Sequence, residues 1–207
     1  MANLSNNTTS TAMQINIKSI FNQFLTEVGK STIEIYNEFS LQHELGIYLR
    51  NKLSSTNYKV QFERNISYFG RISNPIKKEM DICVFNVDGK GNPKDRLCAI
   101  ELKFPRNGQH PEQMYSFVKD IAFMEQVHNQ LGFLHTFTLT IVEDRLFFDG
   151  KEKTGIYSYF RGSKPISGNI NKPTGQNKND YVFVLGNYSI NWKSNTKKYH
   201  YYIVAIS

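Results

Sequence analysis

Residues 96–104, RLCAIELKF, restrict the fold of this chain more than any other stretch. In an extended strand their apolar side chains fall alternately on both sides, as expected for a strand that is buried on both faces. Such strands occur in sheets that carry helices on each side. The stretch therefore predicts an α/β fold with a central mixed β-sheet flanked by helices. Glu101 and Lys103 add charge only where the strand ends.

Hydrophobic spacing predicts the elements around this strand. Helices are expected over 17–28, over 32–53 and from His110 to near Gly132, because apolar residues recur there every three or four positions. Glu44 falls inside the apolar stripe of the second helix. Further strands are predicted at 58–66, 79–86, 133–142, 181–186 and 199–207, and extended segments at 145–148 and 156–160. Residues 162–180 have the composition of a flexible loop.

The positive charge is concentrated in the last quarter of the chain. The formal net charge is +7, and residues 151–207 hold nine Lys and Arg side chains against two Asp and Glu, which accounts for the whole excess. This predicts either a solvated basic face or a surface that contacts phosphates. We divide the chain into a flexible polar leader (1–12), an α/β core (13–150) and a basic β-rich C-terminal lobe (151–207) that continues the same domain.

Signals for export or membrane insertion are not apparent in the sequence. The first residues have neither the basic start nor the apolar run of a secretory signal, and no segment reaches the length of a membrane span. We therefore expect a soluble, cytoplasmic protein.

Three charged side chains are predicted to converge at one end of two neighbouring strands. If 81–85 and 97–101 pair as an antiparallel hairpin, either Asp81 faces Glu101 or, after a two-residue shift, Asp81 faces Lys103. Both registers keep Asp81, Glu101 and Lys103 on one face, because side chains alternate with period two. The first register, with Phe85 opposite Leu97, also sets Cys83 opposite Ala99. Cys98 then points to the other face, so we expect two reduced, packed cysteines rather than a disulfide.

Two opposed carboxylates at a strand end favour a divalent cation. Like charges placed there are destabilising unless something neutralises them. Mg²⁺ takes oxygen ligands and keeps several waters, so two carboxylates leave positions for water and a substrate phosphate. A neighbouring ammonium can orient the attacking water or stabilise charge on the phosphate. An ordinary solvent-facing ion pair between Glu101 and Lys103 is the alternative.

The spacing of these residues resembles the PD-(D/E)xK nuclease superfamily, which has the restriction-endonuclease-like fold. Asp81 begins one strand and Glu101-Leu102-Lys103 ends the next, with a helix before and a helix after, so the resemblance covers about residues 32–142. Met80 replaces the usual proline before the aspartate. The resemblance implies that Asp81 and Glu101 bind Mg²⁺, for which Mn²⁺ can substitute, and that Lys103 acts on the nucleophilic water.

Glu44 is, by the same resemblance, an additional metal ligand or a support of the metal site. Its alternative is a glutamate whose charged end reaches the edge of the apolar stripe. Lys119 on the later helix is a weaker candidate, for which a solvated lysine is the competing interpretation.

DNA is the expected partner, favoured over RNA by the resemblance alone. The resemblance predicts a metal-dependent endonuclease that hydrolyses DNA phosphodiester bonds, and a homodimer would supply two active sites. Restriction, repair, junction resolution, mobile-element and toxin roles all use this core, and the small size of the chain favours a type II restriction-like enzyme among them. The expected DNA contacts are the basic residues Arg161, Lys164, Lys172, Lys178, Lys193, Lys197 and Lys198. Aromatic residues among them could stack on bases or simply pack: Tyr157, Tyr159, Trp192, Tyr199 and Tyr201.

Two competing interpretations stay open. A catalytically inactive nucleic-acid-binding or protein-binding module with a nuclease-like fold would carry the same basic lobe without turnover. A structural α/β protein with a surface ion pair is the third interpretation.

Overall fold

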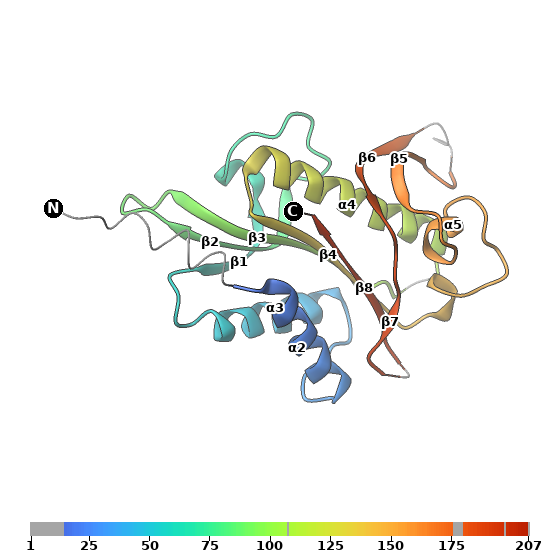
Figure 1. Cartoon of the computed structure of the whole chain (residues 1–207), viewed down its shortest axis with the longest axis horizontal. Coiled ribbons are helices and arrows are strands. Elements are labelled where there is room, and N and C mark those ends of the chain that lie inside the picture. Colours follow the sequence, from blue (N-terminus) through green and yellow to red (C-terminus); the bar gives the residue numbers. More distant parts are fainter. Residues whose placement is uncertain (1–14, 107, 176–179, 197, 207) are drawn as a thin grey trace.

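The computed structural model describes residues 15–106, 108–175, 180–196 and 198–206. Its centre is a six-stranded sheet in the order β1-β2-β3-β4-β8-β7, with helices on both faces (Figure 1). Only β3 and β4 run parallel, so the predicted mixed sheet flanked by helices is confirmed. The strands are β1 (Lys59–Asn65), β2 (Glu79–Val87), β3 (Pro93–Lys103), β4 (His135–Val142), β7 (Lys193–Ser194) and β8 (His200–Ile206).

The two faces of the sheet have separate hydrophobic cores. Helices α2 (Ile17–Gly29) and α3 (Glu38–Lys52) cover one face, and α4 (His110–Leu131) covers the other as it crosses from β3 to β4 (Figure 1). Leu102 of β3 belongs to the first core and Ala99 to the second. Burial of β3 on both faces is thus confirmed, and α4 ends as expected at Gly132, whose φ of 66° is left-handed.

Helix α3 begins later than the predicted residue 32. Asn37 caps the helix: its side chain accepts a hydrogen bond from Ser40 N at 2.7 Å, and Ser40 Oγ accepts one from Asn37 N at 3.0 Å. This reciprocal pair satisfies two backbone donors and fixes the first turn. The prediction of helix over 32–37 was therefore wrong.

The C-terminal part contains more helix and strand than predicted. The segments expected to be extended form a 3₁₀ turn, η2 (Arg145–Phe147), and a short helix, α5 (Tyr157–Phe160), in which Phe147 and Phe160 are buried. Within the predicted loop 162–180, β5 (Ile166–Asn171) pairs with β6 (Tyr181–Tyr188) as a second, two-stranded sheet. Residues 176–179 of that loop lie outside the described residues. The Gly- and Asn-rich composition concealed β5, whose Ile166 and Ile170 are buried by tertiary packing.

Strand β6 is fastened to α4 by a buried carboxylate. Glu125 is 3% exposed and accepts hydrogen bonds from Leu185 N, Gly186 N and the Tyr188 hydroxyl at 2.7 to 2.9 Å. Strand β8 pairs with β4 in the main sheet, so the segment 151–207 contributes to the core instead of forming a separate layer. The predicted leader 1–12 lies outside the described residues.

The predicted hairpin register holds in its centre. Cys83 pairs with Ala99, whereas a shift between Val84 and Phe85 sets Phe85 opposite Arg96. The predicted pairing of Phe85 with Leu97 was therefore wrong, and the bulge turns Leu97 into the core under α2 and α3.

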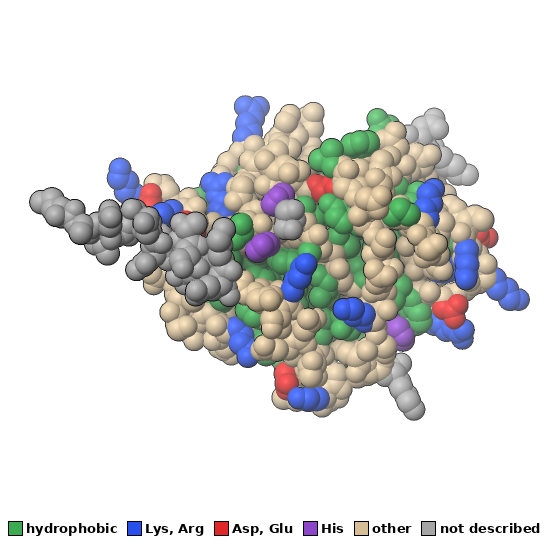
Figure 2. Space-filling view, viewed as in Figure 1, with side chains coloured by type: hydrophobic (Ala, Val, Ile, Leu, Met, Phe, Trp, Pro, Cys, Tyr) green, Lys and Arg blue, Asp and Glu red, His purple; other side chains and the backbone are tan. Residues whose placement is uncertain are grey.

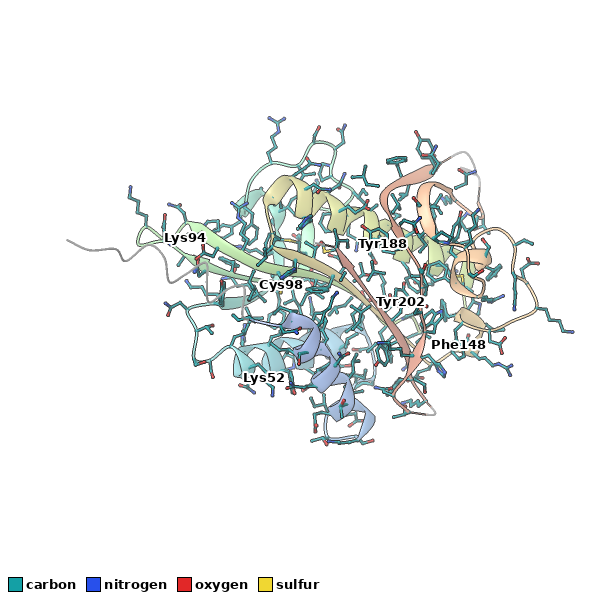
Figure 3. The ribbon with its side chains drawn as sticks, viewed as in Figure 1. Lys52, Lys94, Cys98, Phe148, Tyr188 and Tyr202 are labelled. Atoms are coloured by element: carbon teal, nitrogen blue, oxygen red, sulfur yellow. The ribbon has the colours of Figure 1, made fainter. Side chains whose placement is uncertain are left out.

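The two cysteines are free and buried on opposite faces, as predicted. Figure 3 labels Cys98 within the sheet, with Tyr202 on β8. Among the described helices, none has the length and apolar character needed to span a membrane.

We expect Gly46→Ala to destabilise the fold although alanine normally favours a helix by about 1 kcal/mol. A Cβ at Gly46 would overlap the ring of Phe62, which α3 packs against, so the net loss should be about 1 kcal/mol in urea unfolding. In a Phe62→Ala background the same change should become neutral or stabilising. Equal effects of Gly46→Ala in both backgrounds would contradict the close approach.

Candidate functional site

Asp81, Glu101 and Lys103 meet at one rim of the sheet. Asp81 Oδ2 accepts a hydrogen bond from Leu102 N at 2.7 Å, and Glu101 Oε1 lies 3.4 Å from the N–H of Asp81. The antiparallel register that pairs Cys83 with Ala99 continues to this point, which places the two acids across from each other. Glu101 is only 1% exposed. The structure therefore brings together the three residues of the predicted motif.

Two further residues, which the sequence analysis did not assign, complete this group. Lys77 precedes β2 and forms ion pairs with both Glu101 and Asp120. Asp120 projects from α4, is 1% exposed, and its Oδ2 lies 3.5 Å from Lys103 Nζ. Asp120 thus forms ion pairs with both ammonium groups from the face of the sheet that α4 covers. We call Lys77, Asp81, Glu101, Lys103 and Asp120 the rim cluster.

The sequence carries a signal for Asp120 but a poor one for Lys77. Asp120 follows the buried Phe117 at the three-residue spacing of an inward helical face, where a carboxylate needs a partner. No local sequence pattern shows that Lys77, and not the adjacent Lys78, would reach the rim. Helix α4 fixes the position of Lys77, because Gln126 Oε1 accepts a hydrogen bond from Ile76 N at 3.0 Å and holds the loop that precedes β2 against the helix.

Glu38, not Glu44, is the glutamate of α3 that reaches the rim. Its carboxylate lies 3.3 Å from Lys103 Nζ and accepts a hydrogen bond from Phe104 N at 3.1 Å. Glu44 has a side chain that is 37% exposed and lies 3.8 Å from His43 Nδ1. The expected inward orientation of Glu44 was wrong because its position falls between the buried Leu41–Leu45 stripe and solvent.

Lys119 lines a different cavity from the one beside the rim cluster. That cavity measures about 630 Å³ and lies between α4 and the start of β6, with Glu112, Tyr115 and Tyr181 among its lining residues.

A small cavity opens beside the rim cluster. It measures about 190 Å³ and is lined by Glu38, Phe39, Gln42, Glu63 and Asp81. Gln42 Nε2 donates to Asp81 O at 2.8 Å and to Glu63 Oε1 at 2.5 Å. Glu63 has a left-handed φ of 47°, and the pairing of β1 with β2 skips it. Such a backbone costs a non-glycine residue about 1 kcal/mol or more, and here it sits next to a buried carboxylate.

Burial dominates the electrostatics of the two motif acids. Desolvation raises the pKa of Asp81 to about 6, although the Leu102 N–H and both lysines oppose the shift. Burial, followed by the charges of Asp81 and Asp120, raises the pKa of Glu101 well above its ordinary value. For Lys77, burial lowers the pKa, but Asp120 and Glu101 outweigh it and the net shift is upward. Three carboxylates thus face two ammonium groups, and the remaining negative charge favours binding of a proton or a cation.

The donor set at the rim suits a hard cation with few protein ligands. Asp81 and Glu101 supply carboxylate oxygens, and Mg²⁺ is commonly held by one or two carboxylates with water and phosphate completing its shell. Among the described residues, no group of three or more His, Cys, Asp or Glu side chains is arranged to hold a metal ion. Asp81 and Glu101 are thus the two carboxylates that could hold a cation at the rim, and Glu44, which was expected to be a third ligand, is not beside them.

Several of the basic residues predicted to contact DNA have partners within the protein. The Arg161 guanidinium donates to Leu146 O and Glu152 O and lies 3.9 Å from the centre of the Tyr157 ring. Lys198 pairs with Glu143 at 3.2 Å. Lys193 is exposed on β7, whereas Lys178 and Lys197 lie outside the described residues. On the face in Figure 2, Lys and Arg side chains are scattered, with a loose group near the end that carries α5.

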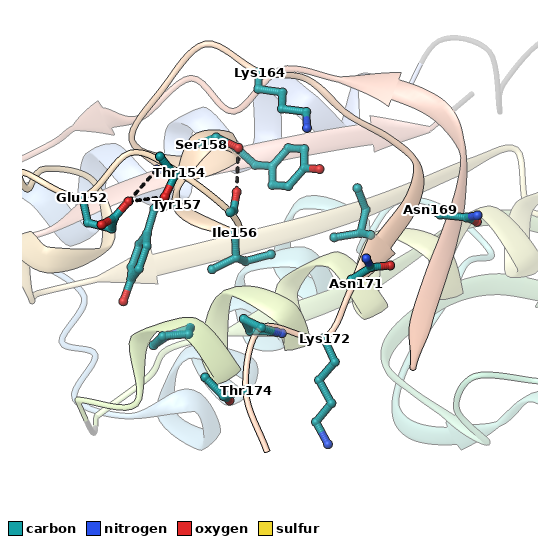
Figure 4. Close-up of a pocket in the computed structure, with 15 residues that line it drawn as sticks. Glu152, Thr154, Ile156, Tyr157, Ser158, Lys164, Asn169, Asn171, Lys172 and Thr174 are labelled. Carbon is teal, nitrogen blue, oxygen red and sulfur yellow. Dashed lines mark hydrogen bonds between the residues drawn. The ribbon is translucent and has the colours of Figure 1, made fainter. Parts of the chain in front are cut away.

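The C-terminal part contains a cavity of its own. It measures about 620 Å³ and lies between α5, β5 and the start of α4, with Lys164 and Lys172 among its lining residues (Figure 4). Lys164 Nζ lies 4.9 Å from the centre of the Tyr159 ring. No carboxylate of the rim cluster lines this cavity. A molecule bound in the cavity would therefore not touch the motif residues through its walls.

Comparison of the chain with protein-family models, with curated proteins and with solved structures gave no match.

We expect Asp81→Asn to stabilise the metal-free protein at pH 7.5. The folded pKa of about 6 exceeds the ordinary 3.8, so the folded state holds more protons between these values and loses stability as pH rises through them. Removing the charge should raise the free energy of unfolding by about 1 to 2 kcal/mol at pH 7.5, and the gain should vanish near pH 4. Urea unfolding in EDTA measures both. A loss of stability at pH 7.5 would contradict the buried, desolvated position of Asp81.

Proposed function

We propose that this protein is a Mg²⁺-dependent deoxyribonuclease that hydrolyses phosphodiester bonds within DNA. The observation that supports this most is the meeting of Asp81, Glu101 and Lys103 at one rim, in the arrangement that the resemblance to the PD-(D/E)xK nucleases implies. The order of elements, with α3 before the three strands β1–β3 and α4 before β4, is consistent with a restriction-endonuclease-like core. A type II restriction-like role in the cytoplasm, with two copies acting on two strands, extends the same proposal.

Each residue has a role that follows from its contacts. Asp81 and Glu101 would hold the cation, with Mn²⁺ able to substitute, and the cation supplies charge stabilisation and a more acidic bound water. Lys103 extends its ammonium at the end of β3, where it can orient the attacking water and stabilise negative charge on the phosphate. In the hydrolysis, the water oxygen bonds to phosphorus, the bond to one ester oxygen breaks, and that oxygen takes up a proton.

Lys103 is held for this role by carboxylates on opposite sides of the sheet. Glu38 of α3 and Asp120 of α4 approach its Nζ at 3.3 and 3.5 Å. Burial lowers the pKa of Lys103, but Asp120 and Glu38 help to raise it overall. Lys103 therefore stays protonated, which makes it a source of positive charge and of hydrogen bonds to the reacting phosphate rather than a proton acceptor.

One observation favours the rival, an inactive nuclease-like module that only binds nucleic acid. Lys77 already forms ion pairs with Glu101 and Asp120, so these carboxylates have a cationic partner without any metal. In that case the protein would bind DNA in EDTA and show no turnover with Mg²⁺ or Mn²⁺.

We expect the wild-type protein to cleave DNA only with Mg²⁺ or Mn²⁺, and Asp81→Asn and Lys103→Ala to lose at least about 100-fold in rate. Supercoiled plasmid, single-stranded DNA and RNA, each with and without metal, form the substrate panel. Glu27→Gln, which breaks only an exposed pair with Lys30 on α2, is the matched surface control. Cleavage that persists in Asp81→Asn or Lys103→Ala would refute the assignment.

The two glutamates of α3 allow a second comparison. Glu38→Gln should slow cleavage more than Glu44→Gln, because only Glu38 contacts Lys103. A loss of about tenfold is expected for Glu38→Gln, the cost of misplacing a charged group by one hydrogen bond. Cleavage rate constants at saturating metal measure this loss. A larger loss of rate in Glu44→Gln than in Glu38→Gln would contradict the prediction and indicate that Glu44 belongs to the site.

A further inference from the structure

An aromatic side chain stands exposed at the cavity beside the rim cluster. Phe39 is 71% exposed, more than any other large hydrophobic residue in the described part of the chain. Its ring lines the cavity with Glu38, Glu63 and Asp81. Tyr36, three residues earlier, is 58% exposed. Neither aromatic residue belongs to the hydrophobic cores of the chain, and Phe39 lies at the edge of the candidate active site.

The backbone that carries Phe39 is fixed. Ser40 Oγ accepts hydrogen bonds from Tyr36 N at 2.8 Å and Asn37 N at 3.0 Å. The ring itself stacks on His43, with centroids 6.3 Å apart and planes 11° apart. Phe39 is therefore presented to solvent in a set orientation, with little conformational entropy left to lose on binding.

Phe39 is also tied to the residues that would act on the phosphate. The neighbouring Glu38 contacts Lys103 Nζ and Phe104 N. Two residues beyond Phe104, Arg106 has a side chain that is 55% exposed, pairs with Glu143 at 3.4 Å and lies 5.8 Å from the Phe104 ring. The exposed ring of Phe39 thus follows directly after the carboxylate that holds Lys103, which suits a nucleotide whose base stacks on the ring while the lysine meets its phosphate.

We propose that Phe39, flanked by Tyr36, stacks on a nucleobase next to the scissile phosphate. This inference rests on the proposed nuclease function and names its substrate class. A base in an intact duplex has both faces covered by its neighbours, so a fixed ring at the cut site selects bases that are unpaired or readily unstacked. The preferred substrates are then single strands, flaps and similar branched DNA, in place of the intact duplex that a type II restriction-like role would require.

The test compares three DNAs of the same sequence: a single strand, a blunt duplex and a duplex with an unpaired flap. Wild type should cleave the single strand and the flap faster than the duplex. Phe39→Ala should slow cleavage of these two by about 5- to 100-fold, the range expected for one lost base stack, and reduce the preference. Phe39→Trp should retain both. Phe39 is exposed, so these variants should fold, which thermal unfolding checks.

Phe183→Ala is the matched control. Phe183 is 55% exposed on β6 and does not line the cavity beside the rim cluster, so its removal deletes a largely exposed ring elsewhere. A binding readout separates stacking from catalysis: in EDTA, a single strand containing 2-aminopurine should change fluorescence with wild type and Phe183→Ala but not with Phe39→Ala.

The outcomes distinguish the two proposals. Absence of cleavage for every substrate overturns the nuclease function and this inference together. Cleavage of the duplex as fast as the single strand, or equal behaviour of Phe39→Ala and Phe183→Ala, overturns the inference and leaves the nuclease function standing. Dissociation of a dimer by Phe39→Ala in sedimentation would assign this surface to a second copy of the chain and also overturn it.

Discussion

Two ammonium groups, Lys77 and Lys103, stabilise three carboxylates at one rim of the sheet. A buried charge without a partner costs several kcal/mol, and Glu101 and Asp120 are each only 1% exposed, whereas Asp81 is partly exposed. The ion pairs connect elements that are far apart in the sequence: the loop before β2, the end of β3 and the middle of α4. Because one ionic group joins all three, changing any member alters the others. The excess of one carboxylate also leaves the rim ready to take up a cation.

The topology explains why this group forms at the rim. The β2–β3 hairpin brings Asp81 beside Glu101, and the parallel pairing of β3 with β4 requires a crossover, which α4 supplies. The crossover lays Asp120 over the charged end of β3. Helix α3, on the other face, brings Glu38 to the same place. Each face of the sheet thus contributes one carboxylate to Lys103, because the two helical layers both reach the end of β3.

The sequence predicts those parts of this arrangement that depend on period two. Strand parity placed Asp81, Glu101 and Lys103 on one face and separated Cys83 from Cys98, and the structure agrees. The prediction failed where a bulge interrupted the alternation of the strand, and where a helix position was assigned to the wrong side. The register shift between Val84 and Phe85 moved Leu97 to the other face. Glu38 reaches the rim from the first turn of α3, whereas Glu44 lies between the buried Leu41–Leu45 stripe and solvent. The sequence could not predict the place of Lys77 in the rim cluster, because that place depends on contacts with α4 that no local pattern encodes.

Two unfavourable features adjoin the same small cavity. Glu63 adopts a left-handed backbone that glycine would adopt without strain, and Phe39 exposes an aromatic ring that a polar residue would replace without loss of packing. Glu63 is skipped by the strand pairing, and Phe39 belongs to neither hydrophobic core. Gln42 hydrogen-bonds to both the strained Glu63 and the backbone of Asp81, so the distortion is linked to a motif acid. Local costs of this kind on either side of one carboxylate are typical of a site shaped for a ligand, and under the proposed function they would place the substrate on this side of the rim.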